Sequence, residues 1–446
     1  MSISEPLTTT TSEYVRPFLS GATKLGIIGQ GYVGLPLAEA FGLSGVHVLG
    51  FDVDPRKVAD VNRGVSYIGD VPTDSLARLV NSGHIAATED FSRLSECEAI
   101  SVCVPTPLDP RREPDMSYID AAVSTIIENL RPGQLIVLES TTYPGTTTKH
   151  VLPRLEAGGL KCGVDFYLAF SPERVDPGNP KYGVKNTAKI IGGVTEECAR
   201  RAYELYAHAL DDVRVVSSPT AAEMVKLLEN TFRAVNIGFI NEFAICCRRL
   251  DVDVWEVIEA AKTKPFGFMP FYPGPGIGGH CIPIDPLYLS WALRALQHPA
   301  KFIELADLVN TGMPQYVVDL IIDQLNGVAK PLRGSKILLL GVAYKEDIDD
   351  MRESPALEVA HLLAHGGAEL SYHDPHVPDC NLGQGPQHSV PLTAETIAAS
   401  DLVLIATAHN NIDYKLVVDN AKLVFDAKNV LRRNGVEFDP AKVRLI

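Results

Sequence analysis

The segment KLGIIGQGYVG, residues 24–34, decides the fold of the first part of the chain. A short apolar run leads into a Gly-x-Gly-x-x-Gly turn, and a second apolar run, VHVLGFD, reaches Asp52 about 20 residues after Gly29. Glycines at these positions allow a tight turn and let the backbone approach a pyrophosphate at a helix N-terminus, while the acidic residue binds ribose hydroxyls. The segment therefore predicts a Rossmann-type dinucleotide site.

Asp52 also indicates which dinucleotide binds. A carboxylate at the ribose position repels the 2′-phosphate of NADP, so we predict NAD. Asp54 is a competing candidate, and we favour Asp52 because it lies nearer the end of the strand. The other contacts expected for NAD lie in the glycine turn, shortly after Asp52, or at later strand ends, where ligands of open α/β sheets bind. They are Gly29, Gln30, Gly31, Tyr32, Val33, Gly34, Lys57, Thr106 and Thr141.

Outward from this segment, short apolar runs alternate with amphipathic stretches as far as residue 216. Alternation of this kind predicts a parallel sheet with helices on both faces. From Ser218 the stretch AAEMVKLLENTFRAVNIGFINEFAICCRRL keeps the apolar period of one long helix, which could also carry a dimer contact. Alternation returns after Pro331 with KILLLGVAY and SDLVLIAT. We predict an α/β protein with two Rossmann-like doubly wound domains joined by a long central helix.

These patterns divide the chain into four parts. The Ser- and Thr-rich residues 1–21 are expected to form a disordered tail. Residues 22–216 would form the NAD-binding Rossmann domain, and residues 217–313 a central helical and dimerisation region. Residues 314–446 would form the second Rossmann-like domain.

Composition excludes several classes of function. Of 446 residues, 40 are Lys or Arg and 55 are Asp or Glu, which gives a net charge of −15, and no Lys/Arg-rich run occurs. Nucleic acid and anionic membranes are therefore poor partners. The apolar runs, such as residues 337–342, are far shorter than the ~20 residues of a membrane helix. Eight scattered cysteines without metal-ligand spacing predict free thiols, no metal site and a cytoplasmic location.

The stretch YPGPGIGGHCIPIDP, residues 272–286, is the most unusual in the chain. Glycines and prolines just before a lone cysteine form a rigid backbone cradle that presents the thiol in a loop. Cys281 is therefore a candidate nucleophile, with core filling as the alternative.

Five motifs occur in order along the chain: GQGYVG (29–34), SPERVDPGN (171–179), AEMVKLLENTF (222–232), GPGIGGHCIPIDP (274–286) and GVAYKEDIDDMRESPA (341–356). In this order they resemble the UDP-glucose/GDP-mannose dehydrogenase family, and the resemblance covers nearly everything from residue 24 to 430. Within the family the details look most like the branch that oxidises UDP-N-acetylglucosamine at C6, on account of residues 264–286, Arg174 and His280.

The resemblance implies covalent catalysis. Cys281 would trap the C6 aldehyde as a thiohemiacetal, because an aldehyde gives up a second hydride only after a nucleophile has made it tetrahedral. Lys226 would aid deprotonation of the alcohol and, with Asn230, stabilise the oxyanion. Asp285 would hold water near the lysine. Taken without the family, Lys226 fits a solvated helix face and Asp285 fits a turn or helix cap.

Glu173 matches the residue of the family that activates water for thioester hydrolysis, assisted by Thr141, although on its own it reads as an exposed loop acid. Arg174 and His280 would face the substituent at C2. Glu173, Lys226 and Asn230 would also contact the substrate. The C-terminal domain would bind the UDP-sugar, and Arg352 matches the arginine on the cofactor side. The further substrate contacts implied are Tyr272, Gly274, Gly276, Gly278, Tyr344 and Lys345.

We therefore expect a cytoplasmic NAD-dependent enzyme that oxidises the C6 hydroxyl of a UDP-sugar, preferably a 2-acetamido sugar, to the carboxylate in two hydride transfers. UDP-glucose and UDP-N-acetylmannosamine are alternative substrates. A two-electron β-hydroxyacid-type dehydrogenase leaves Cys281 unexplained, and a non-catalytic NAD-sensing protein would not need Cys281, Lys226 or Glu173. We also expect a homodimer or higher homo-oligomer, in which Lys262 and Lys264 could reach across the interface, and a role in polysaccharide biosynthesis.

Overall fold

The computed structural model describes residues 23–176, 179, 181–279 and 281–446, so the predicted tail at 1–21 lies outside the described residues. The chain forms two compact units. The first comprises the chain up to Thr106 together with Met116–Lys226, and the second comprises Pro107–Asp115 and Leu227–Ile446. The division into NAD-binding, central and C-terminal domains at residues 216 and 313 stays a prediction.

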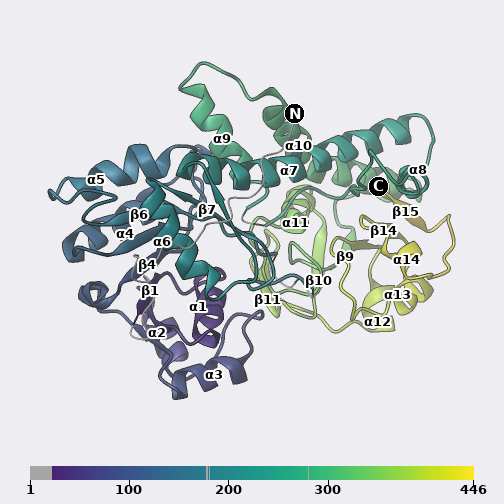
Figure 1. The fold of residues 1–446 in the computed structure, drawn as a ribbon. Helices are drawn as coiled ribbons and strands as arrows, with labels where there is room; N and C mark the ends of the chain where they lie inside the picture. Colours follow the sequence, from purple (N-terminus) through teal and green to yellow (C-terminus); the bar gives the residue numbers. More distant parts are fainter. Residues whose placement is uncertain (1–22, 177–178, 180, 280) are drawn as a thin grey trace. The chain divides into compact units, whose positions relative to one another are not determined.

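The first unit is built on an eight-stranded sheet (Figure 1). The strand order is β3-β2-β1-β4-β5-β6-β7-β8, and all neighbours are parallel except β6 and β7, which are antiparallel. The strands are β1 (Lys24–Ile28), β2 (His47–Phe51), β3 (Ile85–Thr88), β4 (Ala99–Val102), β5 (Leu135–Leu138), β6 (Tyr167–Phe170), β7 (Lys189–Gly193) and β8 (Val213–Val216).

Helices cover both faces of this sheet. Successive residues of one strand belong to different cores: Leu135 packs into one apolar cluster and Ile136 into the other. The helical segments are α1 (Gly34–Leu43), α2 (Pro55–Asn62), α3 (Thr73–Asn81), η1 (Phe91–Glu96), α4 (Ser117–Asn129), η2 (Thr146–Val151), α5 (Leu152–Glu156) and α6 (Glu196–Ala207). Strands buried on both faces explain why the sequence shows continuous apolar runs rather than alternation with polar residues.

The second unit contains a smaller parallel sheet of five strands in the order β10-β9-β13-β14-β15, and a separate hairpin of β11 and β12. Ile337 and Leu338 of β9 again point into two different cores, so this sheet is also covered on both faces. The strands are β9 (Lys336–Leu340), β10 (Glu369–His373), β11 (Asp379–Asn381), β12 (Pro386–His388), β13 (Leu402–Ile405), β14 (Val424–Asp426) and β15 (Val443–Leu445).

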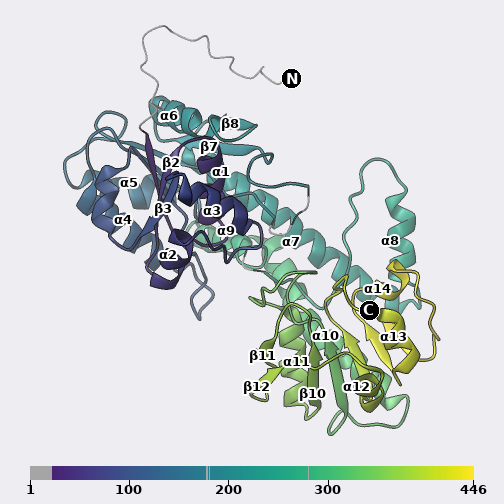
Figure 2. The same ribbon diagram turned by 90° about the horizontal axis from the view of Figure 1, so that it is seen from below.

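Figure 2 shows the second unit with α10 and α11 on one side of its sheet and α13 and α14 on the other. The helices are α7 (Pro219–Arg249), α8 (Val254–Lys262), α9 (Asp285–Arg294), α10 (Lys301–Asn326), α11 (Pro355–His365), α12 (Ala394–Ala399), α13 (Tyr414–Asn420) and α14 (Val430–Arg433). Helix α7 has 31 residues, begins in the first unit and continues into the second. The predicted fold, two doubly wound α/β sheets joined by a long helix, is confirmed.

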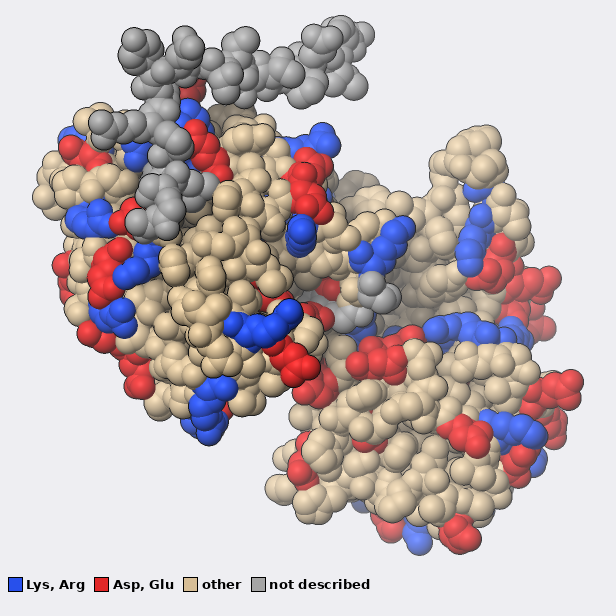
Figure 3. All heavy atoms as spheres, turned by 60° about the horizontal axis from the view of Figure 1, so that its bottom comes forward, with Lys and Arg blue, Asp and Glu red and all other residues tan. Residues whose placement is uncertain are grey.

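Charged side chains of both signs are interspersed on the face shown in Figure 3, and the described residues form no continuous basic area on that face. Across the described part of the chain, no helix combines the length and the apolar character needed to cross a membrane.

Candidate active site

The turn between β1 and α1 has the shape of a pyrophosphate cradle. Gly29 adopts φ +93°, and a Cβ there would lie 2.5 Å from the carbonyl oxygen of Cys103. Gly34 begins α1, and a Cβ on it would lie 1.8 Å from the carbonyl oxygen of Gly29. A Cβ on Gly31 would meet nothing within 4 Å, so the backbone is open to a ligand there. The three glycines thus serve the tight turn, the close helix packing and the ligand approach that a dinucleotide site requires.

Asp52 holds this turn in place. Its Oδ2 accepts the N–H of Gln30 at 2.8 Å, and its Oδ1 accepts the N–H of Asp54 at 2.9 Å. The Lys57 ammonium lies 3.4 Å from Asp52 Oδ2. Asp54 instead caps α2, where it accepts the N–H of Arg56 and pairs with that guanidinium. This geometry supports Asp52 over Asp54 as the residue at the ribose.

The other residues of the turn are placed differently. Gln30 is buried, and its side chain donates to the carbonyl of Ile27 at 2.9 Å, so it supports the turn from within the core. Tyr32 and Val33 are partly buried against the core of the first unit. Tyr67, which sequence reasoning missed, donates its hydroxyl to the carbonyl of Gln30 at 2.6 Å. Thr106 and Thr141, half-buried, follow the neighbouring strands β4 and β5.

The first unit also brings two of the predicted catalytic residues together. The Lys226 ammonium donates to the backbone carbonyl of Glu173 at 2.6 Å. Glu173 Oε1 accepts the N–H groups of Arg174 and Val175, each at 2.7 Å, and Oε2 lies 3.2 Å from the Lys189 ammonium. Burial would raise the pKa of Glu173, but the charge of Lys189 and these N–H donors hold that pKa below its ordinary value. Glu173 is therefore a carboxylate at neutral pH.

Arg174 is anchored near this group. Its guanidinium donates to the backbone carbonyl of Ala188. Nothing in these contacts tests the predicted role of Arg174 at the C2 substituent, which stays a prediction.

In the second unit, three predicted residues are linked around the cysteine loop. The carbonyl of Cys281 accepts the N–H of Asp285 at 2.8 Å, and Asp285 begins α9. Asn230 of α7 donates its side-chain amide to Asp285 Oδ2. Asn230 and Asp285 are buried, whereas Cys281 is half-buried. The thiol is thus presented from a turn whose end is fixed by a buried amide and carboxylate. His280 lies outside the described residues.

The glycines before Cys281 are required by close packing. A Cβ on Gly278 would lie 2.6 Å from the Tyr344 Cβ, and one on Gly279, at φ +90°, would lie 2.9 Å from the Tyr344 ring. Gly276 has φ +139°. The predicted substrate contact Tyr344 therefore packs directly on the glycine loop.

The loop also has a cation that sequence reasoning missed. A Cβ on Gly274 would lie 3.2 Å from the Lys428 ammonium, and the Gly274 N–H donates to the Asn241 side chain at 3.0 Å. Burial lowers the pKa of Lys428. A lysine two residues after the end of strand β14 was the available signal. In contrast, the Tyr272 hydroxyl bonds Glu259 of α8 at 2.7 Å, so its side chain points toward α8.

The turn after β9 carries the remaining predicted substrate residues, and Asp374 holds it. Asp374 follows β10, and its Oδ2 accepts the N–H groups of Val342 at 2.8 Å and Ala343 at 3.2 Å. Tyr344 and Lys345 come next and are half-buried. Arg352 pairs its guanidinium with Asp350, at 2.6 Å between the closest atoms.

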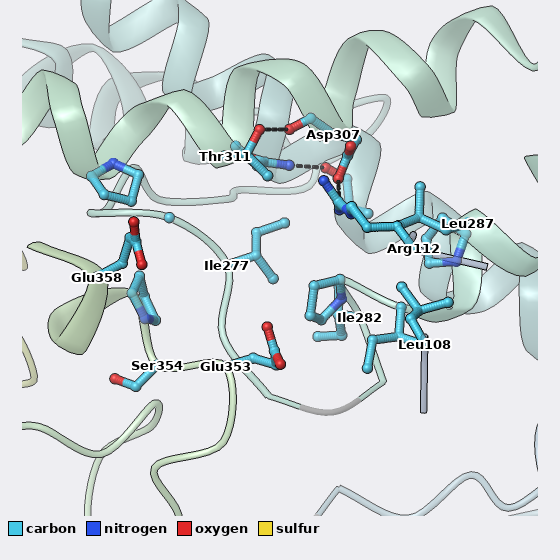
Figure 4. A pocket seen from close by; sticks show the side chains of 18 of the residues that line it. Leu108, Arg112, Ile277, Ile282, Leu287, Asp307, Thr311, Glu353, Ser354 and Glu358 are labelled. Atoms are coloured by element: carbon cyan, nitrogen blue, oxygen red, sulfur yellow. Dashed lines mark hydrogen bonds and ion pairs between the residues drawn. The ribbon is translucent and has the colours of Figure 1, made fainter. Parts of the chain in front are cut away.

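A cavity of about 690 Å³ adjoins the cysteine loop within the second unit (Figure 4). Arg112 and Asp307 form an ion pair of 2.8 Å in its wall. Ile277 and Ile282 of the cysteine loop line it, whereas Cys281 is not among the described residues that do. The cavity therefore flanks the candidate nucleophile without containing it.

One cluster in the described part of the chain has the donor types of a metal site: Asp347, His376 and His409. His409 accepts the N–H of Asp347 on Nδ1 at 2.9 Å, and its Nε2 lies 3.1 Å from Asp374 Oδ2. Both ring nitrogens are therefore already bonded, and the contacts identify His409 as a support for Asp374 rather than a ligand.

Three domains of a single family match successive parts of the chain. Its NAD binding domain matches residues 23–210, its central domain residues 220–312 and its UDP binding domain residues 338–433. The chain belongs to the UDP-glucose/GDP-mannose dehydrogenase family. The predicted family, the NAD cofactor and the enzyme class, an NAD-dependent UDP-sugar dehydrogenase, are confirmed.

Relatives of this dehydrogenase carry names for two acetamido sugars. UDP-N-acetyl-D-mannosamine dehydrogenase of Pyrococcus horikoshii is 34% identical over 421 residues, which cover 93% of this chain and 97% of the relative. UDP-N-acetyl-D-glucosamine 6-dehydrogenase of Pseudomonas aeruginosa is 32% identical over 413 residues, which cover 92% and 95%.

Solved structures agree with this family assignment. The UDP-D-ManNAc dehydrogenase of P. horikoshii superposes with a TM-score of 0.86 at 33% identity, covering 95% of this chain and 99% of that one. A UDP-glucose dehydrogenase of Pyrobaculum islandicum superposes with a TM-score of 0.83 at 30% identity, covering 98% and 100%. The roles of individual site residues stay predictions.

Proposed function

We propose that this UDP-sugar dehydrogenase converts the C6 hydroxyl of a UDP-linked 2-acetamido sugar to a carboxylate in two oxidations, with Cys281 as a covalent nucleophile. The observation that carries this proposal is the cysteine turn. Its thiol is half-buried, its carbonyl bonds Asp285, and Asp285 accepts from the buried amide of Asn230. A fixed and accessible thiol beside polar groups suits capture of an aldehyde better than core packing does.

The chemistry follows from the side chains. Lys226 would bind the C6 oxygen, aid its deprotonation and, together with Asn230, stabilise negative charge on it. Bound NAD would accept a hydride from C6 in each oxidation. The Cys281 sulfur would add to the aldehyde carbon to form a thiohemiacetal, whose oxidation gives a thioester. Glu173, assisted by Thr141, would take a proton from a water molecule as the water oxygen attacks the thioester carbon. The thiolate of Cys281 would then leave.

The diphosphate would lie on the glycine loop. Gly276 and Gly278 pack closely against Pro355 and Tyr344, which fixes the loop backbone, and Lys428 adds a positive charge beside Gly274. Tyr344 and Lys345 follow β9, at the carboxyl end of a parallel sheet, where ligands of such sheets bind. Arg352 would contact the cofactor side.

The acetamido preference is supported by the names of the relatives. UDP-N-acetylmannosamine and UDP-N-acetylglucosamine enzymes both cover nearly the whole chain. Arg174 and His280 would recognise the substituent at C2. A pocket built for an amide leaves polar groups unpaired when the amide is missing, so UDP-glucose should be a poorer substrate.

We further propose a cytoplasmic homodimer or larger homo-oligomer that serves polysaccharide biosynthesis. The second unit exposes large apolar side chains on α7 and α10, among them Leu228 at 67%, Phe239 at 59%, Phe302 at 78% and Leu308 at 68% of their surface. An apolar face of this kind is expected at an interface between copies.

The test counts NADH formed per UDP-sugar consumed, with UDP-N-acetylglucosamine, UDP-N-acetylmannosamine, UDP-N-acetylgalactosamine and UDP-glucose. Two NADH per sugar, with an acetamido sugar giving the highest kcat/KM, supports the proposal. One NADH per sugar would indicate a two-electron dehydrogenase, and faster turnover of UDP-glucose would remove the acetamido preference.

Covalent catalysis is tested with two variants. Glu173→Gln should accumulate one added sugar-nucleotide mass on Cys281 by intact-protein mass spectrometry, because oxidation proceeds while water is no longer activated. Cys281→Ser should lower kcat by about 100-fold or more while binding of the UDP-sugar persists. Cys246→Ser, which changes an exposed cysteine outside the site, is the matched control. A Cys281→Ser variant with near wild-type turnover would remove Cys281 from the mechanism.

A further inference from the structure

A buried ion cluster lies behind Glu173 in the first unit. Lys189 stands at the start of β7, and its side chain is 5% exposed. Its ammonium lies 2.6 Å from Glu139 Oε2 and 3.2 Å from Glu173 Oε2. Burying charge is costly unless the charges are paired, so a lysine in an otherwise apolar strand calls for an explanation beyond packing.

On the side of the cluster away from Glu173, Glu139 is bonded only within the protein. Glu139 is completely buried, and its Oε1 accepts the hydroxyl of Tyr206, which lies 3.1 Å from the Ser101 hydroxyl. Both oxygens of Glu139 are thus bonded within the protein. Glu139 therefore fixes where the Lys189 ammonium sits.

On the other side of the cluster lies Glu173, the residue proposed to activate the hydrolytic water. Glu173 Oε1 receives two backbone N–H groups, from Arg174 and Val175, whereas Oε2 receives the Lys189 ammonium. A carboxylate oxygen accepts two hydrogen bonds, so Oε2 can hold a water in addition to the ammonium. The side chain of Glu173 is 14% exposed, which leaves it within reach of such a water.

We propose that Lys189, anchored by Glu139, is a positioning residue that aims Oε2 of Glu173 at the hydrolytic water and keeps Glu173 ionised during thioester hydrolysis. This inference rests on the proposed function, in which Glu173 activates that water. It adds two residues, Lys189 and Glu139, that act through Glu173.

The groups around Glu173 determine the direction in which each variant should shift the pKa of Glu173. Besides Lys189 and Glu139, the groups of the first unit that act on the cluster are Lys226 of α7, the backbone N–H of Arg174, and the side chains of Cys103 and Tyr206. Burial raises the pKa values of Cys103 and Tyr206. Burial and the charge of Glu173 act together to raise the pKa of Glu139, although Lys189 opposes them. Lys189 is thus the shared countercharge of two carboxylates.

Removal of the countercharge and removal of the second carboxylate have opposite consequences. In Lys189→Met the buried carboxylates of Glu139 and Glu173 lose their shared countercharge, so the pKa of Glu173 rises. The acid limb of the pH profile, where kcat falls at low pH, then moves to higher pH by about one unit or more. In Glu139→Gln the Lys189 ammonium pairs with Glu173 alone, so the pKa of Glu173 falls and the acid limb moves to lower pH. A merely structural role for the cluster would not give shifts of opposite sign.

The experiment measures kcat between pH 5 and 9 for the full-length enzyme, with the UDP-sugar that gives the highest kcat/KM, and looks for the Cys281 adduct at pH 6 by intact-protein mass spectrometry. Lys189→Met should turn over about 10-fold more slowly than wild type at pH 6, accumulate the adduct there and recover toward pH 9. Lys189→Arg keeps the charge and should recover most of the turnover at pH 6. Lys24→Met, which removes a half-exposed lysine paired with Glu96 in the same unit, is the matched control and should behave as wild type.

An unchanged acid limb in Lys189→Met, or shifts of the same sign in Lys189→Met and Glu139→Gln, would overturn the proposal. If Lys189→Met does not fold, the acid limbs of Lys189→Arg and Glu139→Gln are compared. An acid limb that lies at lower pH in Glu139→Gln than in Lys189→Arg supports the proposal. An acid limb that lies at higher pH in Glu139→Gln overturns the proposal. Failure of the proposed function has a different signature, since Glu173→Gln would then carry no adduct at any pH, and the role of Lys189 would fall with it.

Discussion

At the scale of single residues, Asp52 combines two tasks in one carboxylate. It receives backbone N–H groups from Gln30 and Asp54, which fixes the glycine turn, and it places negative charge beside Lys57 where the ribose is expected. A 2′-phosphate there would meet a buried carboxylate whose hydrogen bonds hold it in place. We therefore expect the contacts that shape the turn also to discriminate against NADP.

We predict that Asp52→Ser lowers the ratio of kcat/KM for NAD over NADP by about 10-fold or more, because the repulsion of a 2′-phosphate is removed. Initial rates with each cofactor at fixed UDP-sugar provide the measurement. Asp54→Ala is the matched control: it removes the side-chain cap of α2 and should leave the cofactor ratio unchanged. Equal kcat/KM for NAD and NADP in the unmodified enzyme would contradict the assignment of Asp52.

From the sequence, a role could be proposed for a residue only where a motif carries it, and these roles stay predictions. The glycines, Asp52 and Cys281 stand in local patterns whose physical purpose can be read from their neighbours. Lys189, Glu139 and Lys428 stand in strand ends that look ordinary along the chain, and their importance comes from contacts between residues far apart in sequence. The pairing of Lys226 with the carbonyl of Glu173 is of the same kind.

At the scale of elements, the glycine loop before Cys281 is shaped by Tyr344. An added Cβ on Gly278 would approach the Tyr344 Cβ to 2.6 Å and the Pro355 ring to 2.8 Å, both in packed surroundings. The loop and the turn after β9 must therefore separate if the glycine is replaced.

Gly278→Ala should raise KM for the UDP-sugar by about 10-fold or more and lower stability by about 1–3 kcal/mol, while KM for NAD changes little. Gly312→Ala is the matched control, since a Cβ on this residue of α10 meets nothing within 4 Å and alanine favours the helix by about 0.5–1 kcal/mol. Steady-state kinetics and thermal unfolding of both variants provide the measurement. An unchanged KM in Gly278→Ala would show that the loop does not hold the substrate.

The strands predicted at the buried centre of each sheet correspond to observed strands, because a continuous β-branched run between turn residues is typical of a buried strand. The edge strands β3 and β15 were missed, since they are short and their sequences, IAAT and VRL, carry little pattern. The antiparallel pairing of β6 with β7 was also missed. The direction of a strand depends on the path of the connecting loop, which includes the SPER motif, and local sequence does not encode it.

At the scale of the whole molecule, we expect low pH to reduce the stability of the second unit, because Asp374 becomes protonated. Burial opposes ionisation of Asp374, but the hydrogen bonds from His409 and the backbone lower its pKa from 3.8 to about 2. A carboxyl group whose pKa is lowered by folding contributes stability that is complete above about pH 4 and lost as pH falls toward 2. This contribution is about 2 kcal/mol.

Asp374→Asn should therefore unfold more easily than wild type at pH 7, and the difference in free energy of unfolding should shrink by about 2 kcal/mol between pH 5 and 2. Denaturant titrations at several pH values, followed by circular dichroism, measure it. Asp419→Asn, which changes an exposed acid of α13 paired with Lys415, is the control. A difference that does not depend on pH would mean that the charge of Asp374 contributes nothing.

Asp52 and Asp374 occupy equivalent places. Each follows the second strand of a parallel pair, β2 or β10. Asp52 accepts one backbone N–H from the turn after the first strand, β1, and Asp374 accepts two from the turn after β9. One carboxylate holds the turn expected to bind the dinucleotide, and the other holds the turn that leads to Tyr344 and Lys345. The same arrangement of a carboxylate bonded to a neighbouring turn thus occurs twice in one polypeptide, once at the turn predicted to bind the coenzyme and once at the turn predicted to bind the nucleotide sugar. We therefore expect a substitution at one of these carboxylates to change binding at its own turn and to leave the other turn unchanged.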